Sequence, residues 1–126
     1  MPVAAIVYVR DVAASLAFYE AVLAVPPQHI DDDGSYGELE HGETRVGFAA
    51  HWHAERNLAI PFRRGDPREP PGGFSLYFVV DDVDAAFARA IDAGARAVNP
   101  PEEKPWGRTA IARDPDDGLL VELIEA

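Results

Sequence analysis

The chain repeats one sequence pattern in its two halves. Residues 6–23 read IVYVRDVAASLAFYEAVL, and residues 77–94 read YFVVDDVDAAFARAIDAG. At an offset of 71 positions, Asp11 of the first copy aligns with Asp82 of the second. Each copy combines a strand-like apolar run, an aspartate and an amphipathic stretch. A repeat of this kind predicts two similar units in one pseudo-symmetric fold, with any binding site between them.

The first copy carries the signals of a strand followed by a helix. Residues 3–9 are an apolar run rich in valine, which is typical of a strand. Asp11 then fits a helix N-cap, because its carboxylate can accept from the free amides of the first turn. Apolar residues follow at helical spacing up to Pro26, where we expect the helix to have ended. This stripe consists of Val12, Leu16, Tyr19 and Leu23.

The second copy repeats the order. A strand over residues 74–80 precedes Asp82, which caps a second amphipathic helix, and Gly94 suits a left-handed C-cap. The remaining strand signals lie at residues 35–40, 44–50, 97–99, 107–113 and 119–125. The predicted order is therefore β-α-β-β-β in each copy. Residues 51–73 form a segment rich in proline and arginine that is too long for a simple turn.

Composition excludes several classes of protein. The 126 residues suit a single domain, and 48% of them are hydrophobic, which is enough for a core. Cysteine is absent, so disulfides and thiolate metal sites are impossible. The formal net charge of −11 opposes binding to nucleic acid phosphates. No stretch reads as a signal peptide or a transmembrane segment, so we expect a cytoplasmic protein without nucleic acid or membrane partners.

Five motifs together resemble the vicinal oxygen chelate superfamily, which includes glyoxalase I, methylmalonyl-CoA epimerase, extradiol dioxygenases and the bleomycin-resistance proteins. They are V-R-D-V-x-x-S-L-x-F-Y-x-x-V-L at 9–23, V-D-D-V-D-A-A at 80–86, P-W-G-R at 105–108, R-D-P-D at 113–116 and V-E-L at 121–123. The resemblance implies an α+β fold of two βαβββ modules, whose open, cup-like mixed sheets have helices outside. It also implies a homodimer.

On this reading residues 1–126 form one domain, with module one at 1–52, a connector at 53–73 and module two at 74–126. Strand alternation predicts which side chains line the cup. Ile6 and Tyr8 face it from the first strand, Ser75 and Tyr77 from its repeat, and Glu122 from the last strand.

The resemblance also implies where a catalytic metal would bind. Metal-dependent members take four ligands from cup-facing positions, which correspond here to Ala4, Gly47, Ser75 and Glu122. Alanine and glycine offer no donor, and a serine hydroxyl is a poor ligand for zinc, nickel or iron. We therefore expect no metal and no other cofactor.

The nearest resemblance is then to the metal-free, bleomycin-resistance-like members that bind antibiotics. It implies a homodimeric binding protein that sequesters an aromatic compound such as an antibiotic, and the acidic surface favours a cationic one. No catalytic residue is predicted. The candidate ligand-binding residues are Tyr8, Trp52, Phe62, Ser75, Tyr77, Trp106 and Glu122.

Three alternatives stay open. The chain could be a lyase, isomerase or dioxygenase-like enzyme with an atypical metal site, for which His51 and His53 would converge if their segment is extended. It could instead be a regulatory protein whose connector arginines bind another protein. Glu122 could be neutralised by an internal partner, Arg108 or Arg45, rather than by a ligand.

Overall fold

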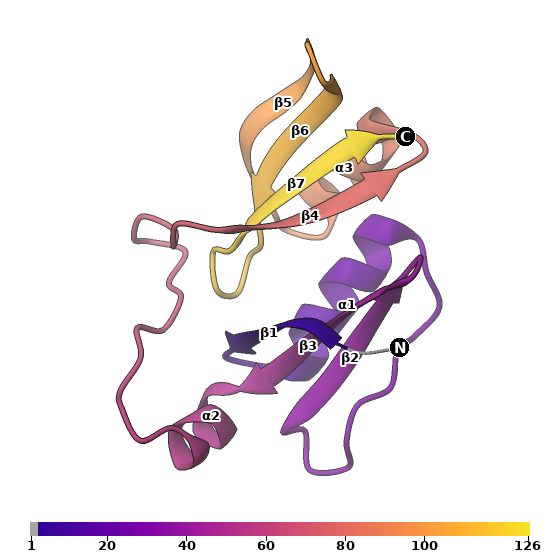
Figure 1. Ribbon diagram of the computed structural model, residues 1–126. Helices are drawn as coiled ribbons and strands as arrows, with labels where there is room; N and C mark the ends of the chain where they lie inside the picture. The colour runs from indigo at the N-terminus through magenta and orange to yellow at the C-terminus, as the bar shows by residue number, and fades with distance from the viewer. Residues whose placement is uncertain (1–2) are drawn as a thin grey trace.

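The computed structural model describes residues 3–126 and has an α+β architecture with two mixed sheets and three helices (Figure 1). The elements in chain order are β1 (Val3–Val9), α1 (Val12–Leu23), β2 (Tyr36–His41), β3 (Thr44–Ala50), α2 (His51–Asn57), β4 (Ser75–Val80), α3 (Val83–Asp92), β5 (Arg96–Lys104), β6 (Gly107–Arg113) and β7 (Leu120–Glu125).

The two sheets have corresponding topologies, as the repeat predicts. The first has the order β1-β3-β2 and the second the order β4-β7-β6-β5. In each sheet the first strand pairs in parallel with the last strand of its module, and the other pairings are antiparallel. The first sheet lacks one strand of the expected pattern, because Ile30 makes only an isolated bridge to Gly37. The proline pair at 26–27 and the turn at 31–34 leave too little chain for a longer strand.

The repeated aspartates act as predicted. Asp11 Oδ1 accepts from the Ala14 amide at 3.0 Å, and Asp82 Oδ1 accepts from the Ala85 amide at 3.1 Å. Helix α1 ends with Ala24 in the left-handed region, at φ 53° and ψ 46°. Glycine is the usual residue in that conformation, so Ala24 holds a local strain.

The core lies between the helices and the covered faces of the sheets. Helices α1 and α3 are neighbours, and the Arg89 guanidinium of α3 donates to the Val22 carbonyl of α1 at 2.9 Å. The strand faces alternate as predicted. Val7 and Val9 of β1 are buried, and so are Val121 and Leu123 of β7. The largest fully buried side chains are Tyr19, Phe48, Leu16, Leu39 and Leu123.

Helix α2, which the sequence did not indicate, leads from β3 into the connector. Its N-cap is Ala50, which has no side-chain oxygen to accept from the first turn, so the usual start signal is missing. Residues 58–74 then run along one side of the molecule to β4 without regular structure (Figure 1). None of the helices within residues 3–126 has the length and apolarity needed to cross a membrane.

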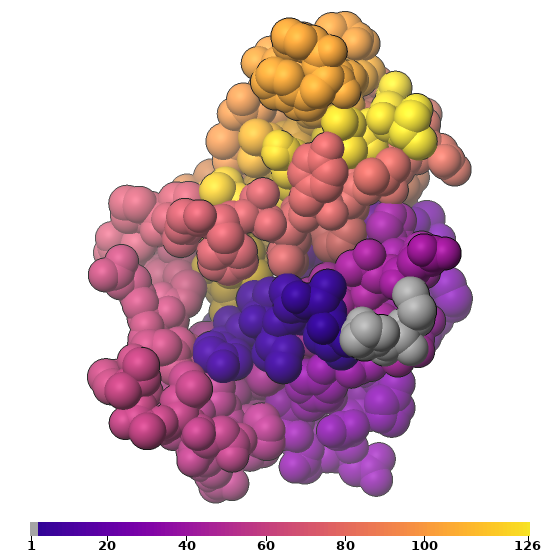
Figure 2. All heavy atoms as spheres, viewed as in Figure 1, coloured from indigo at the N-terminus to yellow at the C-terminus, as the bar shows by residue number. Residues whose placement is uncertain are grey.

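A buried arginine attaches the connector to the turn between β6 and β7. Arg113 is 9% exposed, and its Nη2 donates to the carbonyls of Glu69 at 2.7 Å and Asp66 at 3.2 Å. Its Nε donates to the Gly118 carbonyl at 2.8 Å. One guanidinium therefore joins the connector to the second sheet. Figure 2 shows a hollow between β1 and the connector on this side of the molecule.

Candidate functional site

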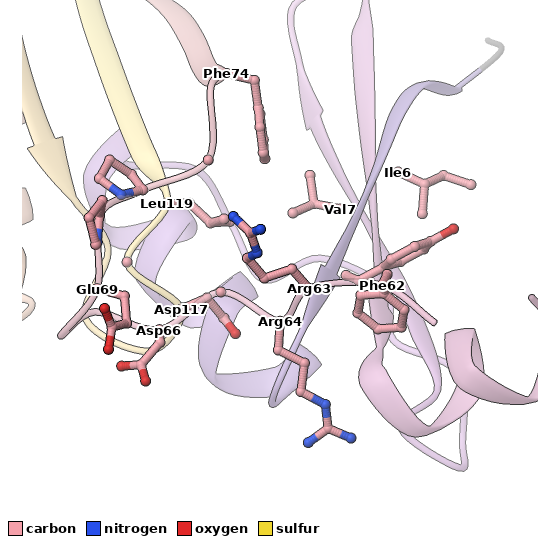
Figure 3. A pocket seen from close by; sticks show the side chains of 16 residues that line it. Ile6, Val7, Phe62, Arg63, Arg64, Asp66, Glu69, Phe74, Asp117 and Leu119 are labelled. Atoms are coloured by element: carbon pink, nitrogen blue, oxygen red, sulfur yellow. The ribbon is translucent and has the colours of Figure 1, made fainter. Parts of the chain in front are cut away.

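A cavity of about 630 Å³ lies between β1, the connector and the turn that joins β6 to β7 (Figure 3). Its apolar wall is formed by Ile6, Tyr8, Phe62, Phe74 and Leu119. This volume is in the range of pockets that bind small molecules. The cavity is built from both halves of the chain.

Two of the predicted ligand-binding residues meet in this cavity. Tyr8 points away from the core because Val7 and Val9, its neighbours in β1, point into it. The Tyr8 ring lies 4.9 Å from the Phe62 ring, centroid to centroid, at an interplanar angle of 57°. Aromatic surface of this kind binds flat apolar groups by stacking and area burial.

The turn below the cavity is ordered by a buried carboxylate. Asp114 Oδ1 accepts from the backbone amides of Asp117 at 2.8 Å and Gly118 at 3.0 Å. Its Oδ2 accepts from the Tyr19 hydroxyl at 2.8 Å. Burial raises the pKa of Asp114, and burial together with the Asp114 charge raises the pKa of Tyr19. These contacts fix the backbone at positions 117–119, which line the cavity.

The other predicted residues do not join this cavity. Tyr77, with 52% of its surface exposed, lines a separate cavity of about 350 Å³ together with His41 and Val46. Ser75 is exposed on the same edge strand. Trp106 is 65% exposed in the turn between β5 and β6.

Trp52 also lies outside the cavity. It is 41% exposed on α2, and the Arg56 guanidinium lies 5.2 Å from its ring centroid. Both tryptophans therefore lie on the surface, and neither forms part of the cavity wall. Tyr8 and Phe62 remain as the two aromatic residues of the predicted set that the fold brings together.

Glu122 lies on the face of the second sheet opposite the buried Val121 and Leu123, as predicted. It is half-buried between its strand neighbours Tyr77 and Ile111. Within residues 3–126 no side chain pairs with its carboxylate. The alternative of an internal arginine partner is therefore wrong, because Arg108 pairs with Asp84 at 2.8 Å and Arg45 pairs with Glu40 at 3.1 Å.

The four positions that hold metal ligands in the metal-dependent members do not fit a catalytic metal here. The Tyr36 ring occupies the space that a side chain at Gly47 would need, and its hydroxyl donates to Glu38 at 2.9 Å. Burial and the Glu38 hydrogen bond raise the pKa of Tyr36 to about 12, so it stays a neutral phenol. Ala4 offers no donor, which leaves the Ser75 hydroxyl and one carboxylate, too few for a catalytic ion.

The alternative metal site at His51 and His53 is also wrong. The two residues lie in helix α2, where side chains two positions apart point to different sides. His51 is buried, whereas His53 is only partly buried and lies 3.3 Å from the Asn57 amide nitrogen. They cannot share one ion.

A group of three carboxylates elsewhere already has protein partners. Oxygens of Asp82, Asp84 and Glu125 lie within 4.8 Å of one another near the start of α3. Asp82 caps the helix, Glu125 accepts from the Val83 amide at 3.0 Å, and Asp84 binds Arg108. The cluster serves the helix terminus.

Sequence reasoning missed two side chains of the cavity. Asp117 is fully buried, and Arg63 extends into the cavity. The arginine-rich composition of the connector was the only signal for Arg63, because a loop without periodicity does not reveal where a side chain points.

Comparison with known proteins agrees with the topology. Residues 2–123 match the family model described as Glyoxalase/Bleomycin resistance protein/Dioxygenase superfamily. The chain belongs to this superfamily. The match includes both copies of the repeat and the connector between them, so the family assignment covers the whole cavity.

Two relatives illustrate how the superfamily varies in length. "Uncharacterized protein YraH" of Bacillus subtilis is 27% identical over 114 residues, which cover 89% of this chain and 88% of YraH. "Putative glyoxylase CFP32" of Mycobacterium tuberculosis is 31% identical over 111 residues, covering 84% of this chain. The match spans only 37% of the length of CFP32.

A solved structure supports the same fold. The structure described as hypothetical protein SA1046 from S. aureus superposes with a TM-score of 0.78 at 18% identity. The superposition covers 96% of this chain and 90% of that protein. At this identity the likeness concerns the fold alone.

Proposed function

We propose that this member of the superfamily is a binding protein that sequesters a small aromatic compound, as the antibiotic-binding members do. The observation that carries the proposal is the cavity beside β1, where the Tyr8 and Phe62 rings form an aromatic wall. The proposal is also supported by the four positions that hold metal ligands in metal-dependent members, because their residues here offer too few donors for a catalytic ion. The name of CFP32 points to glyoxylase chemistry, but that chemistry in this family relies on the metal ligands that are missing here.

A calorimetric titration tests the proposal. Untagged protein is titrated with a panel of one-ring and two-ring aromatic compounds that carry positive, negative or no charge. We expect at least one to bind saturably at one site per chain. In Phe62→Leu, which keeps the apolar volume but removes the ring, that affinity should fall about tenfold, equivalent to about 1.4 kcal/mol.

Two controls locate the binding. Trp106→Phe, far from the cavity, should leave the affinity unchanged, and a chelator added to the cell should have no effect. Absence of saturable binding across the panel would contradict the proposal. So would near-stoichiometric zinc, nickel, iron or manganese in the untagged protein by elemental analysis, together with loss of binding on its removal.

We also propose that the chain forms a homodimer through the open face of its sheets. Large apolar side chains of the edge strand β4 are exposed there, with exposed fractions of 52% for Tyr77 and 48% for Val79. A cluster of this kind favours association, because burial removes apolar area from water. Light scattering should give twice the chain mass, and Val79→Lys should shift the equilibrium towards monomer.

A further inference from the structure

The connector has a different charge balance from the rest of the chain. Residues 53–73 contain four arginines and three carboxylates, although the whole chain has a net charge of −11. This segment forms one wall of the aromatic cavity. The charged residues that line the cavity are Arg63, Arg64, Asp66, Glu69 and Asp117.

Two of the four arginines are neutralised by carboxylates, and a third packs on an aromatic ring. Arg64 binds Glu55 through two hydrogen bonds of 2.7 and 2.8 Å. Arg68 binds Asp66 at 3.0 Å. The guanidinium of Arg56 lies over the ring of Trp52, outside the cavity. The remaining arginine of the connector is Arg63.

Arg63 has no ion-pair or hydrogen-bond partner within residues 3–126. Its side chain extends into the cavity, towards Leu119, Val7 and Phe74, whereas that of Arg64 points away (Figure 3). A guanidinium placed beside apolar walls is a preformed site for a planar anion, because its N–H groups can donate in parallel to two oxygens.

The acidic residues around the cavity limit the charge of the ligand. The Asp66 carboxylate is bound to Arg68, and the Asp117 side chain is fully buried. Glu69 lines the cavity without an ion pair among the described residues. One available cation near the carboxylates of Glu69 and Asp117 suits an anion with a single charge, such as a carboxylate, better than a phosphate dianion.

We propose that the cavity selects small aromatic carboxylates, with the ring against Tyr8 and Phe62 and the carboxylate on Arg63. The inference rests on the proposed binding function and names the ligand class for the same site. The proposed ligand is an anion, whereas the net charge of the chain alone favours a cation. The charges next to a ligand decide, because distant charges are screened by salt.

Three matched probes test the ligand class: 2-naphthoate, the neutral 2-naphthamide and the cationic 2-naphthylmethylammonium. They present the same ring system with different charges. By calorimetry at pH 7.5 we expect naphthoate to bind about tenfold tighter than naphthamide, as one charge-assisted hydrogen-bonded pair at a partly exposed site provides. The ammonium compound should bind weakest.

Substitutions assign the preference to one side chain. Arg63→Gln should reduce the affinity for naphthoate to that for naphthamide and leave naphthamide binding within twofold. Arg56→Gln is the matched control, and it should change neither affinity. Raising the salt concentration should weaken naphthoate binding in the native protein and not in the Arg63→Gln variant.

The outcomes separate the two proposals. Equal or tighter binding of naphthamide or the ammonium probe, or a preference for naphthoate that survives Arg63→Gln, would overturn the selectivity for carboxylates. In that case the binding function would stand. If none of the three probes and no member of the wider panel binds, both proposals are overturned.

Discussion

His51 Nε2 lies 3.8 Å from Asp117 Oδ1, with the two side chains 7% and 0% exposed. His51 Nε2 and Asp117 Oδ2 are buried without a hydrogen-bond partner. Burial lowers the pKa of His51 and raises the pKa of Asp117 to about 6. With the one proton of the neutral imidazole donated from Nδ1 to the backbone of Tyr8, Nε2 and the carboxylate oxygen both accept, so the contact lacks a proton at neutral pH. Arg10, whose amide donates to Asp117 at 2.9 Å, together with Asp114 and Asp116 completes the charged surroundings.

Asp117 predicts that its own contribution to stability becomes more favourable on acidification, whereas the lowered pKa of His51 acts in the opposite direction. The pKa of Asp117 is about 6 when folded, above the ordinary value of 3.8, so between these pH values the folded chain binds a proton that the unfolded chain does not. The cost of the ionised carboxylate is present above pH 6 and disappears as the pH falls towards 4. Asp117→Asn should remove that cost and raise the free energy of unfolding by about 1–3 kcal/mol at pH 7.5.

Urea unfolding at several pH values, followed by tryptophan fluorescence, measures this effect. The difference between Asp117→Asn and the native protein should shrink as the pH falls from 7.5 to 4.5. Asp116→Asn, which removes the neighbouring and more exposed carboxylate, is the matched control and should show a smaller change. A stability difference that does not vary with pH would contradict the account of the contact.

Ala24 predicts a stabilising substitution. Its left-handed conformation, with φ 53°, is costly for alanine and free for glycine, so Ala24→Gly should stabilise the protein by about 1 kcal/mol. Ala93 is the C-cap of α3 at φ −85°, an ordinary value, so Ala93→Gly should give no gain. Thermal unfolding compares the two. A loss of stability in Ala24→Gly would show that its strain is relieved in another way.

The Tyr19 hydroxyl should be important for the turn between β6 and β7. Tyr19→Phe leaves one buried oxygen of Asp114 without its donor, so the free energy of unfolding should fall by about 1–3 kcal/mol. Tyr36→Phe removes a hydroxyl from the half-buried pair with Glu38 and should cost less. Urea unfolding measures both, and equal costs for the two substitutions would contradict the special role of Asp114.

Arg113 should control how tightly the connector is held. Arg113→Met removes the donors to the carbonyls of Asp66 and Glu69, so the connector should detach more often. Limited trypsin digestion reports this, because the connector arginines are cleavage sites. We expect cleavage to be about tenfold faster, which corresponds to about 1.4 kcal/mol in the opening equilibrium. Arg96→Met, at an exposed position of β5, is the control. An unchanged cleavage rate in folded Arg113→Met would contradict the anchoring.

The sequence predicted the parts of the fold that local patterns determine. Asp11 and Asp82 were recognisable as caps because the capping hydrogen bond spans three residues, and strand alternation placed Val121 and Glu122 on opposite faces. The α2 helix was missed because it starts at Ala50 without a capping side chain.

The candidate site was only partly predictable, because local sequence patterns do not reveal contacts between distant parts of the chain. Tyr8 follows from strand alternation, but Phe62 reaches it through a loop whose path is set by Arg113, more than 40 residues further along the chain. Tyr77 and Glu122 were placed on the correct face, yet the cavity that contains Tyr8 lies elsewhere. Distant contacts of this kind leave no periodic trace in the sequence.

The crystal structure of the protein bound to 2-naphthoate is the most direct test of the central claim. The account predicts ring density packed against the wall formed by Tyr8 and Phe62, and a carboxylate within hydrogen-bond distance of the Arg63 guanidinium. Density on the concave face of the second sheet, beside Tyr77 and Glu122, would contradict it.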